Sequence, residues 1–374
     1  MFADLGVLTW VAASIPALMW VGLLLAPWRP WSTREHIEAD LHAAPAVSLA
    51  EITVLIPARN EAEMIGATLA ALRVQATDLN VLVIDDQSSD ATVQIAAAYP
   101  NTRIISGRPL PDGWAGKLWA LEQGMAHVDT AMTLLLDADI QLQPGLLVSL
   151  LAHKRREGRH LVSLMADLRR TSFWDRLLLP VFVYYFKLLY PFSLSNSRSR
   201  HVAAAAGGCV LVDTQVLRNV GAFASLRDAL IDDCTLARQV KNAGYSTWLG
   251  LSRDVVSLRS YGSLGSIHDM VARSAFTQLR YSTLLLLMVT AVFALAYGLP
   301  FVLLASAHVW PLGLVAWAAM TLSYIPVLRY YGMSPSWALL LPLSAMLYLG
   351  MTWSSALSYW RGMRSRWKGR TYGV

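Results

Sequence analysis

Long apolar segments at both ends of the chain set the first limit on its fold. Residues 4–26 contain a single charged side chain, Asp4, and residues 282–328 contain none. Residues 336–358 are similarly apolar. About 20 consecutive apolar residues are enough to cross the hydrocarbon core of a bilayer as a helix. Because 55% of all residues are hydrophobic and only 15% are charged, we expect a membrane protein rather than an ordinary soluble one.

The first apolar segment is predicted to be a retained transmembrane anchor over residues 1–27. It lacks a basic region before its apolar run, the run is longer than that of a typical signal peptide, and no small-x-small cleavage site follows. Three further segments, at about 282–305, 309–328 and 336–358, make up a predicted membrane region over residues 282–360. We therefore expect a multi-pass protein of the cell inner (cytoplasmic) membrane.

Basic residues indicate on which side of the membrane the chain ends. Residues 281–374 carry six basic side chains and no acidic one, and five of the six lie between 361 and 370, within a basic tail over 361–374. The positive-inside rule places this tail in the cytosol. Three crossings after a cytosolic domain would place it outside. We therefore predict that one segment is re-entrant or interfacial, and we assign this to residues 336–358, which contain Pro342.

The middle of the chain has the pattern of an α/β domain. Four short apolar runs alternate with segments of helical periodicity; the runs are 52–57, 81–84, 102–107 and 132–136. Strands that alternate with helices form a mainly parallel sheet covered by helices. We place this domain at residues 51–260, with a linker over 28–50 before it and a connector over 261–281 after it. No GxGxxG follows any of the runs, which disfavours a dinucleotide-binding fold.

Acidic residues follow several of the predicted strands. Asp137 and Asp139 stand one residue apart, so in an extended chain they project from the same side. Two carboxylates held that close repel each other unless a cation lies between them, which suggests Mg²⁺ or Mn²⁺. Residues 57–61 and 85–86 lie at the ends of other strands. In parallel sheets ligands bind beyond the carboxyl ends of the strands, so we expect these residues to converge on one site.

Six motifs in order resemble the family 2 glycosyltransferases of the GT-A fold: IPARNE, VIDDQSSDAT, GWAGKLWAL, LLLDAD, AAGG and IDDCTLARQVKNAGY. The resemblance covers residues 51–258. LPDGWAGK, DD-x-x-LAR-x-VK and the terminal WKGRTY look like the hopanoid-biosynthesis-associated membrane glycosyltransferases; carotenoid and ceramide glycosyltransferases are similar but more distant. The resemblance implies an inverting, metal-dependent enzyme that adds one sugar from a nucleotide-diphospho-sugar to a membrane lipid. No nucleic acid partner is expected.

The same resemblance implies roles for residues around the donor. Asp139 would be the metal ligand, and Asp137 would contact the ribose or the donor sugar. Asp86 would hold the nucleobase or the ribose, with Pro57 and Glu61 forming the other wall of the site. For Glu61 the alternative interpretation is an acidic residue in the first turn of a helix, where the helix dipole favours it.

Two basic residues are candidates for the diphosphate. Lys117 lies in GWAGK before a predicted helix, and its alternative interpretation is a simple surface lysine. Arg280 is the second candidate, although its surroundings depart from the Gln/Arg-x-x-Arg-Trp motif of processive synthases, with Thr277 and Tyr281 at the key positions. This departure disfavours polymer extrusion. Asp90 is interpreted as the N-cap of the helix that follows it.

Asp233 is the candidate general base, because inverting transfer needs one carboxylate near the acceptor hydroxyl. The family motif is usually Glu-Asp, and here it reads Asp232–Asp233, which leaves the role of Asp232 open. Adjacent acids can also raise the pKa of one of them towards the working pH. The alternative classes are a membrane nucleotidyltransferase, which needs paired acids but not Asp233, and a non-enzymatic membrane scaffold.

Residues 176–194 form an aromatic, apolar segment within the predicted catalytic domain. Its prolines and Lys187 disfavour a crossing, so we predict an interfacial helix at the membrane surface. Its expected acceptor- and membrane-facing residues are Phe182, Tyr185, Phe186 and Tyr190. The alternative is a core helix of the soluble domain. We expect a hopanoid- or isoprenoid-related lipid acceptor, with a ceramide-like lipid or polyprenyl phosphate as the alternative. Because nucleotide sugars are cytosolic, the catalytic domain should face the cytosol.

Overall fold

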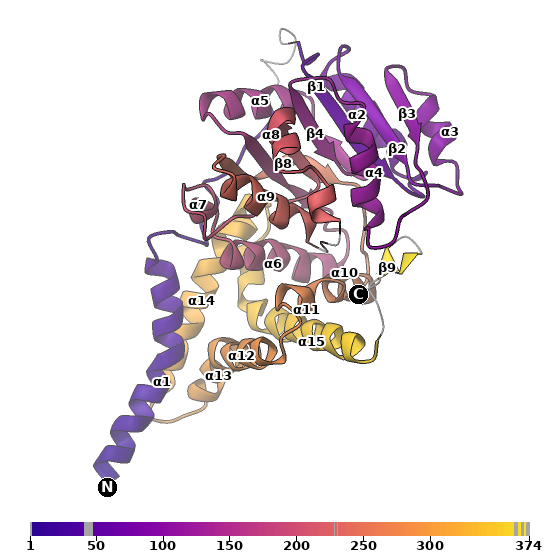
Figure 1. The fold of residues 1–374 in the computed structure, drawn as a ribbon. Helices are drawn as coiled ribbons and strands as arrows, with labels where there is room; N and C mark the ends of the chain where they lie inside the picture. The colour runs from indigo at the N-terminus through magenta and orange to yellow at the C-terminus, as the bar shows by residue number, and fades with distance from the viewer. Residues whose placement is uncertain are drawn as a thin grey trace. The chain divides into compact units, whose positions relative to one another are not determined.

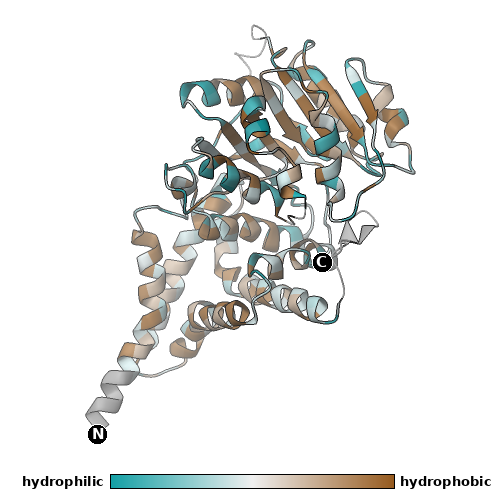
Figure 2. Ribbon diagram, viewed as in Figure 1, coloured by the Kyte–Doolittle hydropathy of each residue, from teal (hydrophilic) through white to brown (hydrophobic). Residues whose placement is uncertain are grey.

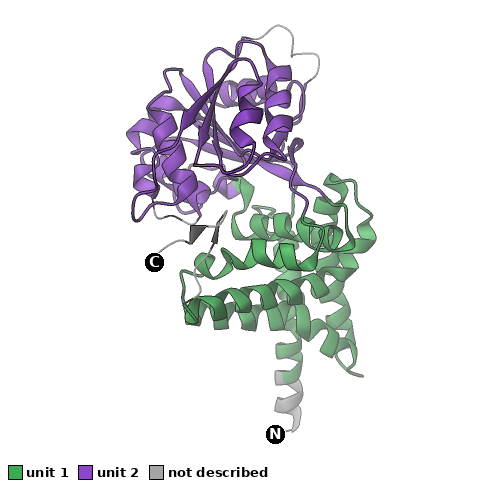
Figure 3. Ribbon diagram, turned by 90° about the vertical axis from the view of Figure 1, so that its right-hand side faces the viewer, with its two compact units in different colours: residues 1–33, 170–193, 261–363 green, residues 34–169, 194–260, 364–374 purple. Residues whose placement is uncertain are grey.

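The chain forms two compact units, which Figure 3 shows in different colours. The computed structural model describes residues 2–40, 48–227, 229, 231–362, 366–367 and 370–371, with the backbone alone for 2–8, 366–367 and 370–371. Unit 1 comprises Met1–Thr33, Arg170–Ser193 and Tyr261–Met363. Unit 2 comprises Arg34–Arg169, Leu194–Ser260 and Arg364–Val374. The aromatic segment that we had included in the catalytic domain is thus grouped with the apolar helices of unit 1.

Unit 2 is built on an eight-stranded sheet with the strand order β3-β2-β1-β4-β7-β6-β8-β5 (Figure 1). The strands are β1 (Ile52–Ala58), β2 (Asn80–Asp85), β3 (Thr102–Ser106), β4 (Met132–Leu136), β5 (Ile140–Leu142), β6 (Leu161–Leu168), β7 (Cys209–Asp213) and β8 (Thr247–Ser257). Strands β3, β2, β1 and β4 pair in parallel, as do β6 and β8. Strand β7 is antiparallel to β4 and β6, and β5 is antiparallel to β8. The mainly parallel α/β sheet and its first four strands are therefore confirmed.

Helices cover both faces of this sheet. They are α2 (Ile65–Gln75), α3 (Thr92–Ala97), α4 (Gly116–Met125), α5 (Leu146–Arg156), α8 (Thr214–Asn219), α9 (Asp232–Asn242) and the short η2 (Ala224–Leu226). Strand β1 is buried along its whole length. Because side chains alternate along a strand, Val54 packs in one apolar cluster with α2 and α5, and Leu55 packs in a second cluster with α4 and α9. The two layers hold the carboxyl ends of the central strands in fixed positions.

Part of the predicted linker over 28–50 belongs to the sheet. The Leu251 N–H of β8 donates to the Glu35 carbonyl (2.9 Å), and the Ile37 N–H donates to the Leu251 carbonyl (3.0 Å). Near the end of the chain, β9 (Arg366–Trp367) and β10 (Arg370–Thr371) form an antiparallel pair. The rest of the predicted basic tail after residue 362, including Lys368, lies outside the described residues.

Unit 1 consists of helices that are largely apolar (Figure 2). They are α1 (Phe2–Leu25), α6 (Phe173–Leu189), α7 (Phe192–Ser195, whose last residues belong to unit 2), α10 (Leu264–Ala272), α11 (Ala275–Gln278), α12 (Thr283–Phe293), η3 (Ala294–Gly298), α13 (Leu299–Leu304), α14 (Trp310–Tyr330), η4 (Pro335–Leu340) and α15 (Leu341–Trp360). Among the residues that the structure describes with side chains, three helical runs are long and apolar enough to cross a membrane: Thr283–Leu304, Trp310–Tyr330 and Pro335–Trp360. Helix α1 packs along α14.

Helix α6 occupies the predicted interfacial segment. A capping box starts it, because the Asp175 N–H donates to Ser172 Oγ and the Ser172 N–H donates to Asp175 Oδ2, both at 3.0 Å. The four predicted acceptor-facing residues, which lie on or just after this helix, are half-buried: Phe182, Tyr185, Phe186 and Tyr190. The Tyr185 ring packs against Phe293, Tyr297 and Tyr348 of unit 1. Helix α6 is thus part of the helical unit and does not lie in the core of unit 2.

Candidate active site

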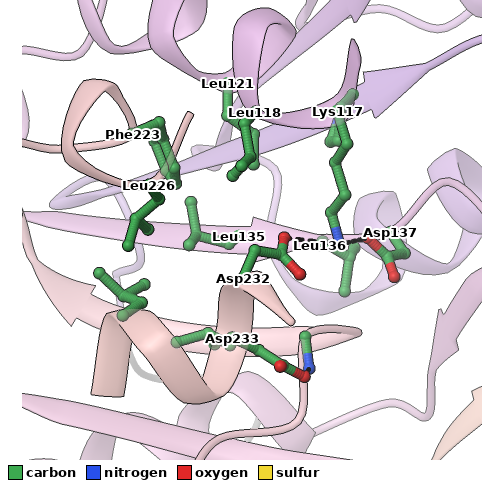
Figure 4. A pocket seen from close by; sticks show the side chains of 14 residues that line it. Lys117, Leu118, Leu121, Leu135, Leu136, Asp137, Phe223, Leu226, Asp232 and Asp233 are labelled. Atoms are coloured by element: carbon green, nitrogen blue, oxygen red, sulfur yellow. Dashed lines mark hydrogen bonds and ion pairs between the residues drawn. The ribbon is translucent and has the colours of Figure 1, made fainter. Parts of the chain in front are cut away.

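A pocket in unit 2 brings together four of the predicted site residues. Pro57, Lys117, Asp137 and Asp233 all line it, together with Asp232 (Figure 4). Its remaining walls are Gly207, Leu136 of the first core cluster and apolar side chains of the second core cluster. The five site residues come from the end of β1, the start of α4, the end of β4 and the start of α9. Local folding therefore places residues separated by up to 176 positions around one small space.

Lys117 is the cation at the centre of this pocket. Its Nζ lies 2.6 Å from Asp137 Oδ1 and 3.9 Å from Asp232 Oδ2, and Figure 4 shows the side chain reaching from α4 towards both carboxylates. Burial acts to lower the pKa of Lys117, but the charges of Asp137 and Asp232 outweigh it and raise the pKa above its ordinary value. The side chain is 24% exposed. Lys117 is therefore an ion-paired residue of the pocket, and the surface-lysine interpretation is wrong.

Asp233 is held by backbone donors at the start of α9. Its Oδ2 accepts from the Gly207 N–H (2.8 Å) and its Oδ1 accepts from the Cys234 N–H (2.7 Å). A Cβ at position 207 would lie 3.3 Å from Asp233 Oδ2 and 3.5 Å from Lys117 Nζ. The close approach of the 207 backbone therefore favours glycine there. These contacts fix the carboxylate in one orientation towards the pocket.

Burial raises the pKa of Asp233 to about 6, with a further upward contribution from the neighbouring charge of Asp232. The two backbone donors and the charge of Lys117 act in the opposite direction but do not cancel the rise. A carboxylate with a pKa close to neutrality can both accept and release a proton under physiological conditions. Asp233 has the acid–base property that a general base needs.

A second ion cluster holds two more of the predicted residues. Arg259 Nε lies 2.9 Å from Asp139 Oδ2, and Arg259 Nη2 lies 3.4 Å from Glu61 Oε1. Glu61 comes from the turn after β1, Asp139 from the turn after β4, and Arg259 from the segment after β8. Neither Glu61 nor Asp139 lines the pocket around Lys117. The structure thus joins these two residues through one guanidinium, as the convergence of strand ends predicts.

Asp86 has its own basic neighbour. Its carboxylate is buried and its Oδ2 lies 3.9 Å from Arg59 Nη1, which also donates to the Asp86 carbonyl (2.5 Å). The Asp86 N–H donates to the Ala58 carbonyl (2.8 Å), so the ends of β1 and β2 are tied together. Asp86 does not line the pocket around Lys117. Arg280 belongs to unit 1, where it is exposed in a left-handed turn with φ of 51°.

Asp90 acts locally, but the N-cap of α3 is Ala91 and not Asp90 as expected. Its Oδ1 accepts from the Thr92 N–H (3.0 Å) at the first residue of α3. Its Oδ2 accepts from the Ala62 N–H (3.1 Å), which ties the turn after β1 to the turn after β2. Asp90 therefore stabilises the loops that carry Glu61 and Asp86 and is not a member of either ion cluster.

The acidic residues of the site fit a divalent cation whose remaining coordination positions are filled by a bound ligand. Among the residues that the structure describes, no three His, Cys, Asp or Glu side chains gather into a closed metal site. Asp137 and Asp139 are nevertheless close: burial raises the pKa of Asp137 and the charge of Asp139 adds to the rise, while Lys117 opposes it. Mg²⁺ is commonly bound through one or two carboxylates together with substrate phosphates. Two interacting carboxylates are enough for that arrangement.

Arg259 is the functional candidate that sequence reasoning missed. No motif marks it, since it lies in the unremarkable stretch SLRSYG. The sheet topology, however, does point to Arg259. Strand β8 is parallel to β6, which runs in the same direction as β4, so the end of β8 lies at the same edge as the ends of β1 and β4. A basic residue two positions after β8 is therefore a candidate partner for the acids at that edge.

The structure predicts how the Asp233 carboxyl titrates. We expect a midpoint near pH 6 in a ¹³C NMR titration of the purified protein. Asp232→Asn should lower the midpoint, because it removes a neighbouring negative charge, and Lys117→Met should raise it, because it removes a positive one. Asp129→Asn, at an exposed position outside the pocket, serves as the control and should leave the midpoint unchanged. A midpoint near 4 in the parent protein would contradict this description of the pocket.

Part of the chain is similar in sequence to known proteins. Residues 53–221 match the model of Glycosyl transferase family 2. The 4,4'-diaponeurosporenoate glycosyltransferase of Staphylococcus aureus strain USA300 is 35% identical over 89 residues, which are 24% of this chain and 24% of that protein. The protein of the same name from strain NCTC 8325 matches to the same extent. The alignment therefore spans about a quarter of the curated relatives.

A solved structure shares the fold over most of the chain. The mannosyltransferase PcManGT from Pyrobaculum calidifontis, determined in complex with GDP-Man and Mn²⁺, aligns with a TM-score of 0.53. The alignment covers 93% of this chain and 98% of that chain at 18% sequence identity, and at this identity it shows the fold alone. The expected GT-A fold is confirmed. Residues 53–221 are thus similar to the family 2 glycosyltransferases.

Proposed function

We propose that this protein is an inverting glycosyltransferase that moves one sugar from a nucleotide-diphospho-sugar to a membrane lipid. The observation that carries the proposal is the pocket in which Lys117 pairs with Asp137 beside Asp233, within a family 2 domain. One cation suited to phosphate and one carboxylate of raised pKa are the two groups that such a transfer needs.

Asp233 is the proposed general base. The acceptor hydroxyl oxygen attacks the anomeric carbon and forms the new C–O bond, while the bond from that carbon to the diphosphate breaks. The hydroxyl proton passes to the Asp233 carboxylate, and the nucleoside diphosphate leaves. A pKa of about 6 keeps Asp233 mostly ionised at neutral pH and able to take the proton. The alternative of a nucleotidyltransferase gives Asp233 no such task.

The remaining site residues are proposed to bind the donor. Lys117 exchanges its contact with Asp137 for the diphosphate, because phosphate oxygens attract an ammonium group at least as well as a carboxylate does. Asp137 contacts the ribose or the sugar. Asp86 holds the nucleobase or ribose, with Pro57 and Glu61 as the opposite wall. Arg280 is proposed as a further diphosphate contact, on its resemblance to the family pattern alone.

Mg²⁺ or Mn²⁺ is the proposed cofactor, with Asp139 as its principal protein ligand. Such a cation neutralises the charge that develops on the departing diphosphate. The proposal is supported by the paired carboxylates and by the Mn²⁺ in the PcManGT structure. In the structure, Arg259 forms ion pairs with Asp139 and Glu61. Arg259 is therefore a counter-ion that the metal and donor must partly replace.

The acceptor is proposed to be a hopanoid- or isoprenoid-related lipid, with a ceramide-like lipid or polyprenyl phosphate as the alternative. A partial match to a diaponeurosporenoate glycosyltransferase supports a lipid acceptor. Unit 1, with three helical runs long enough to cross a membrane, supports a location at the cytoplasmic membrane. The aromatic residues of α6, with Tyr190 just after it, are proposed to face the lipid, and the catalytic domain is proposed to face the cytosol.

The transfer itself can be tested with purified protein. We expect incubation with UDP- and GDP-sugars, Mn²⁺ and separate hopanoid, ceramide and polyprenyl phosphate acceptors to yield one singly glycosylated lipid class by mass spectrometry. Asp233→Asn should lower the rate by about 10²–10⁴-fold, because it removes the base. Asp129→Asn, an exposed acid outside the site, is the matched control and should keep the parental rate. Equal rates for Asp233→Asn and the control would exclude this mechanism.

Metal binding can be tested without turnover. Arg259→Gln removes the guanidinium that neutralises Asp139 and Glu61, so we expect a lower melting temperature in EDTA. Mn²⁺ should then raise the melting temperature of the variant by more than that of the parent, because the cation takes over the same charges. Arg253→Gln removes an exposed ion pair with Glu38 in the same unit and should show the parental response to Mn²⁺. Identical Mn²⁺ shifts in all three proteins would argue against a metal at Asp139.

A further inference from the structure

The start of the first long apolar run of unit 1 contacts the end of the third run. The Tyr281 ring, just before α12, stacks on the Tyr359 ring of α15 with centroids 4.5 Å apart and an interplanar angle of 20°. Phe276 also contacts the Tyr359 and Trp360 rings, at 5.5 and 5.7 Å. About two turns into α12, Thr290 Oγ1 accepts a hydrogen bond from Trp353 Nε1 of α15 (3.0 Å). The end of α15 therefore lies beside the start of α12.

The connections between the runs are too short to cross a membrane. Residues 305–309 join the first run to α14, and residues 331–334 join α14 to the third run. Five residues reach at most about 18 Å when extended, whereas the hydrocarbon core is about 30 Å thick. Each run therefore begins on the face where the preceding one ends. Three crossings would put Tyr359 on the face opposite Tyr281, and two rings stacked at 4.5 Å exclude that.

The positions of charged residues indicate which of the three apolar runs begins and ends on the same face of the membrane. The first connection, 305–309, carries no Lys, Arg, Asp or Glu. Charged groups lie at both ends of the third run instead: the Arg170 guanidinium is 4.7 Å from the Tyr331 ring just before it, and Arg361 follows it. Along α15, Ser354 Oγ is 2.9 Å from His268 Nε2, and the neighbouring Asp269 is 85% exposed. In Figure 1, α1 and α14 run side by side, and α15 lies beside α11 and α12 and points in a different direction from α1 and α14.

We infer that α15 does not cross the membrane and instead lies along the face from which α12 starts. The first two turns of α12 pack along α15 and lie with it at that face. The rest of the first run forms a hairpin with α14 whose tip, residues 305–309, points away from that face. Arg280, Arg329 and Arg361 then all lie at one face, which the positive-inside rule identifies as cytosolic. The inference rests on the proposed membrane location of unit 1 but on no catalytic step.

The partner of α15 is the head-group and upper acyl layer of the cytosolic leaflet. One face of the helix is held by the protein: Ser344 Oγ donates to the Leu177 carbonyl (3.1 Å) and Tyr348 Oη to the Leu178 carbonyl (2.9 Å) of α6. Other apolar side chains of α15 are between 43% and 52% exposed: Leu343, Met346, Leu357 and Trp360. A helix with one apolar face open and charges at both ends is suited to lie in the membrane interface.

Cysteine labelling tests the topology in the full-length protein. The two native cysteines are both buried, so an introduced cysteine is the accessible thiol. We would place single cysteines at Asp269, before the hairpin, at Ser336, after α14, and at Gly362, after α15. A membrane-impermeant maleimide should modify none of the three in right-side-out vesicles and all three after permeabilisation. Modification at 362 or 336 from outside, with 269 protected, would overturn the inference. Modification of all three before permeabilisation would refute the proposed cytosolic orientation itself.

Depth measurement provides an independent test that does not depend on vesicle orientation. Spin labels at Leu339, Met346 and Leu357 sample the start, middle and end of the third run, and all three native side chains are exposed. If the run lies along the face, electron paramagnetic resonance should report similar depths for the three labels. A crossing helix rises 1.5 Å per residue, so the label at 346 would be about 10 Å deeper than the other two. That depth profile would overturn the inference even if one labelling variant failed to fold.

Discussion

The repulsion between carboxylates at one edge of the sheet is the constraint on which the site depends. Asp137 and Asp139 follow β4 and influence each other, and the start of α9 brings Asp232 and Asp233 into the pocket that Asp137 lines. Such a cluster is stable only when cations are built into it. Lys117 forms ion pairs with Asp137 and Asp232, and Arg259 forms ion pairs with Asp139 and Glu61. The proposed cation-bound diphosphate would bind at this same edge.

The two halves of this arrangement have different chemical properties. The pocket around Lys117 has apolar walls, and that burial raises the pKa of Asp233. The cluster around Arg259 joins the turns after β1 and β4, and the nearby Asp86 is held by Arg59. In the proposed reaction, the pocket supplies both the base Asp233 and the cation Lys117 for the diphosphate, and the second cluster supplies Asp139 and Glu61 for the metal and the nucleoside. The strand ends of one sheet edge carry both sets of residues, which is what the proposed transfer requires.

Much of this was predictable from the sequence, for identifiable physical reasons. The runs at 52–57, 81–84 and 132–136 are apolar on both faces, which is typical of central parallel strands, and they are strands β1, β2 and β4. Strand β7 was harder, because nothing in CVLVD distinguishes an antiparallel strand from a parallel one. Arg259 was missed because its importance depends on the direction of β8. The assignment of 176–194 to unit 1 depends on tertiary contacts such as those of Tyr185, which no local pattern encodes.

The central claim is that the side chains around Lys117 form a binding site for a nucleoside diphosphate. Isothermal titration calorimetry of UDP and GDP in the presence of Mn²⁺ tests it directly, with the parent protein, Lys117→Met and Asp129→Asn compared under one buffer. A lost charge-assisted hydrogen bond weakens binding by about tenfold or more, so Lys117→Met should bind the nucleotide at least tenfold more weakly than the parent and the control. Equal affinity in all three proteins, or no binding of either nucleotide by the parent, would contradict the account.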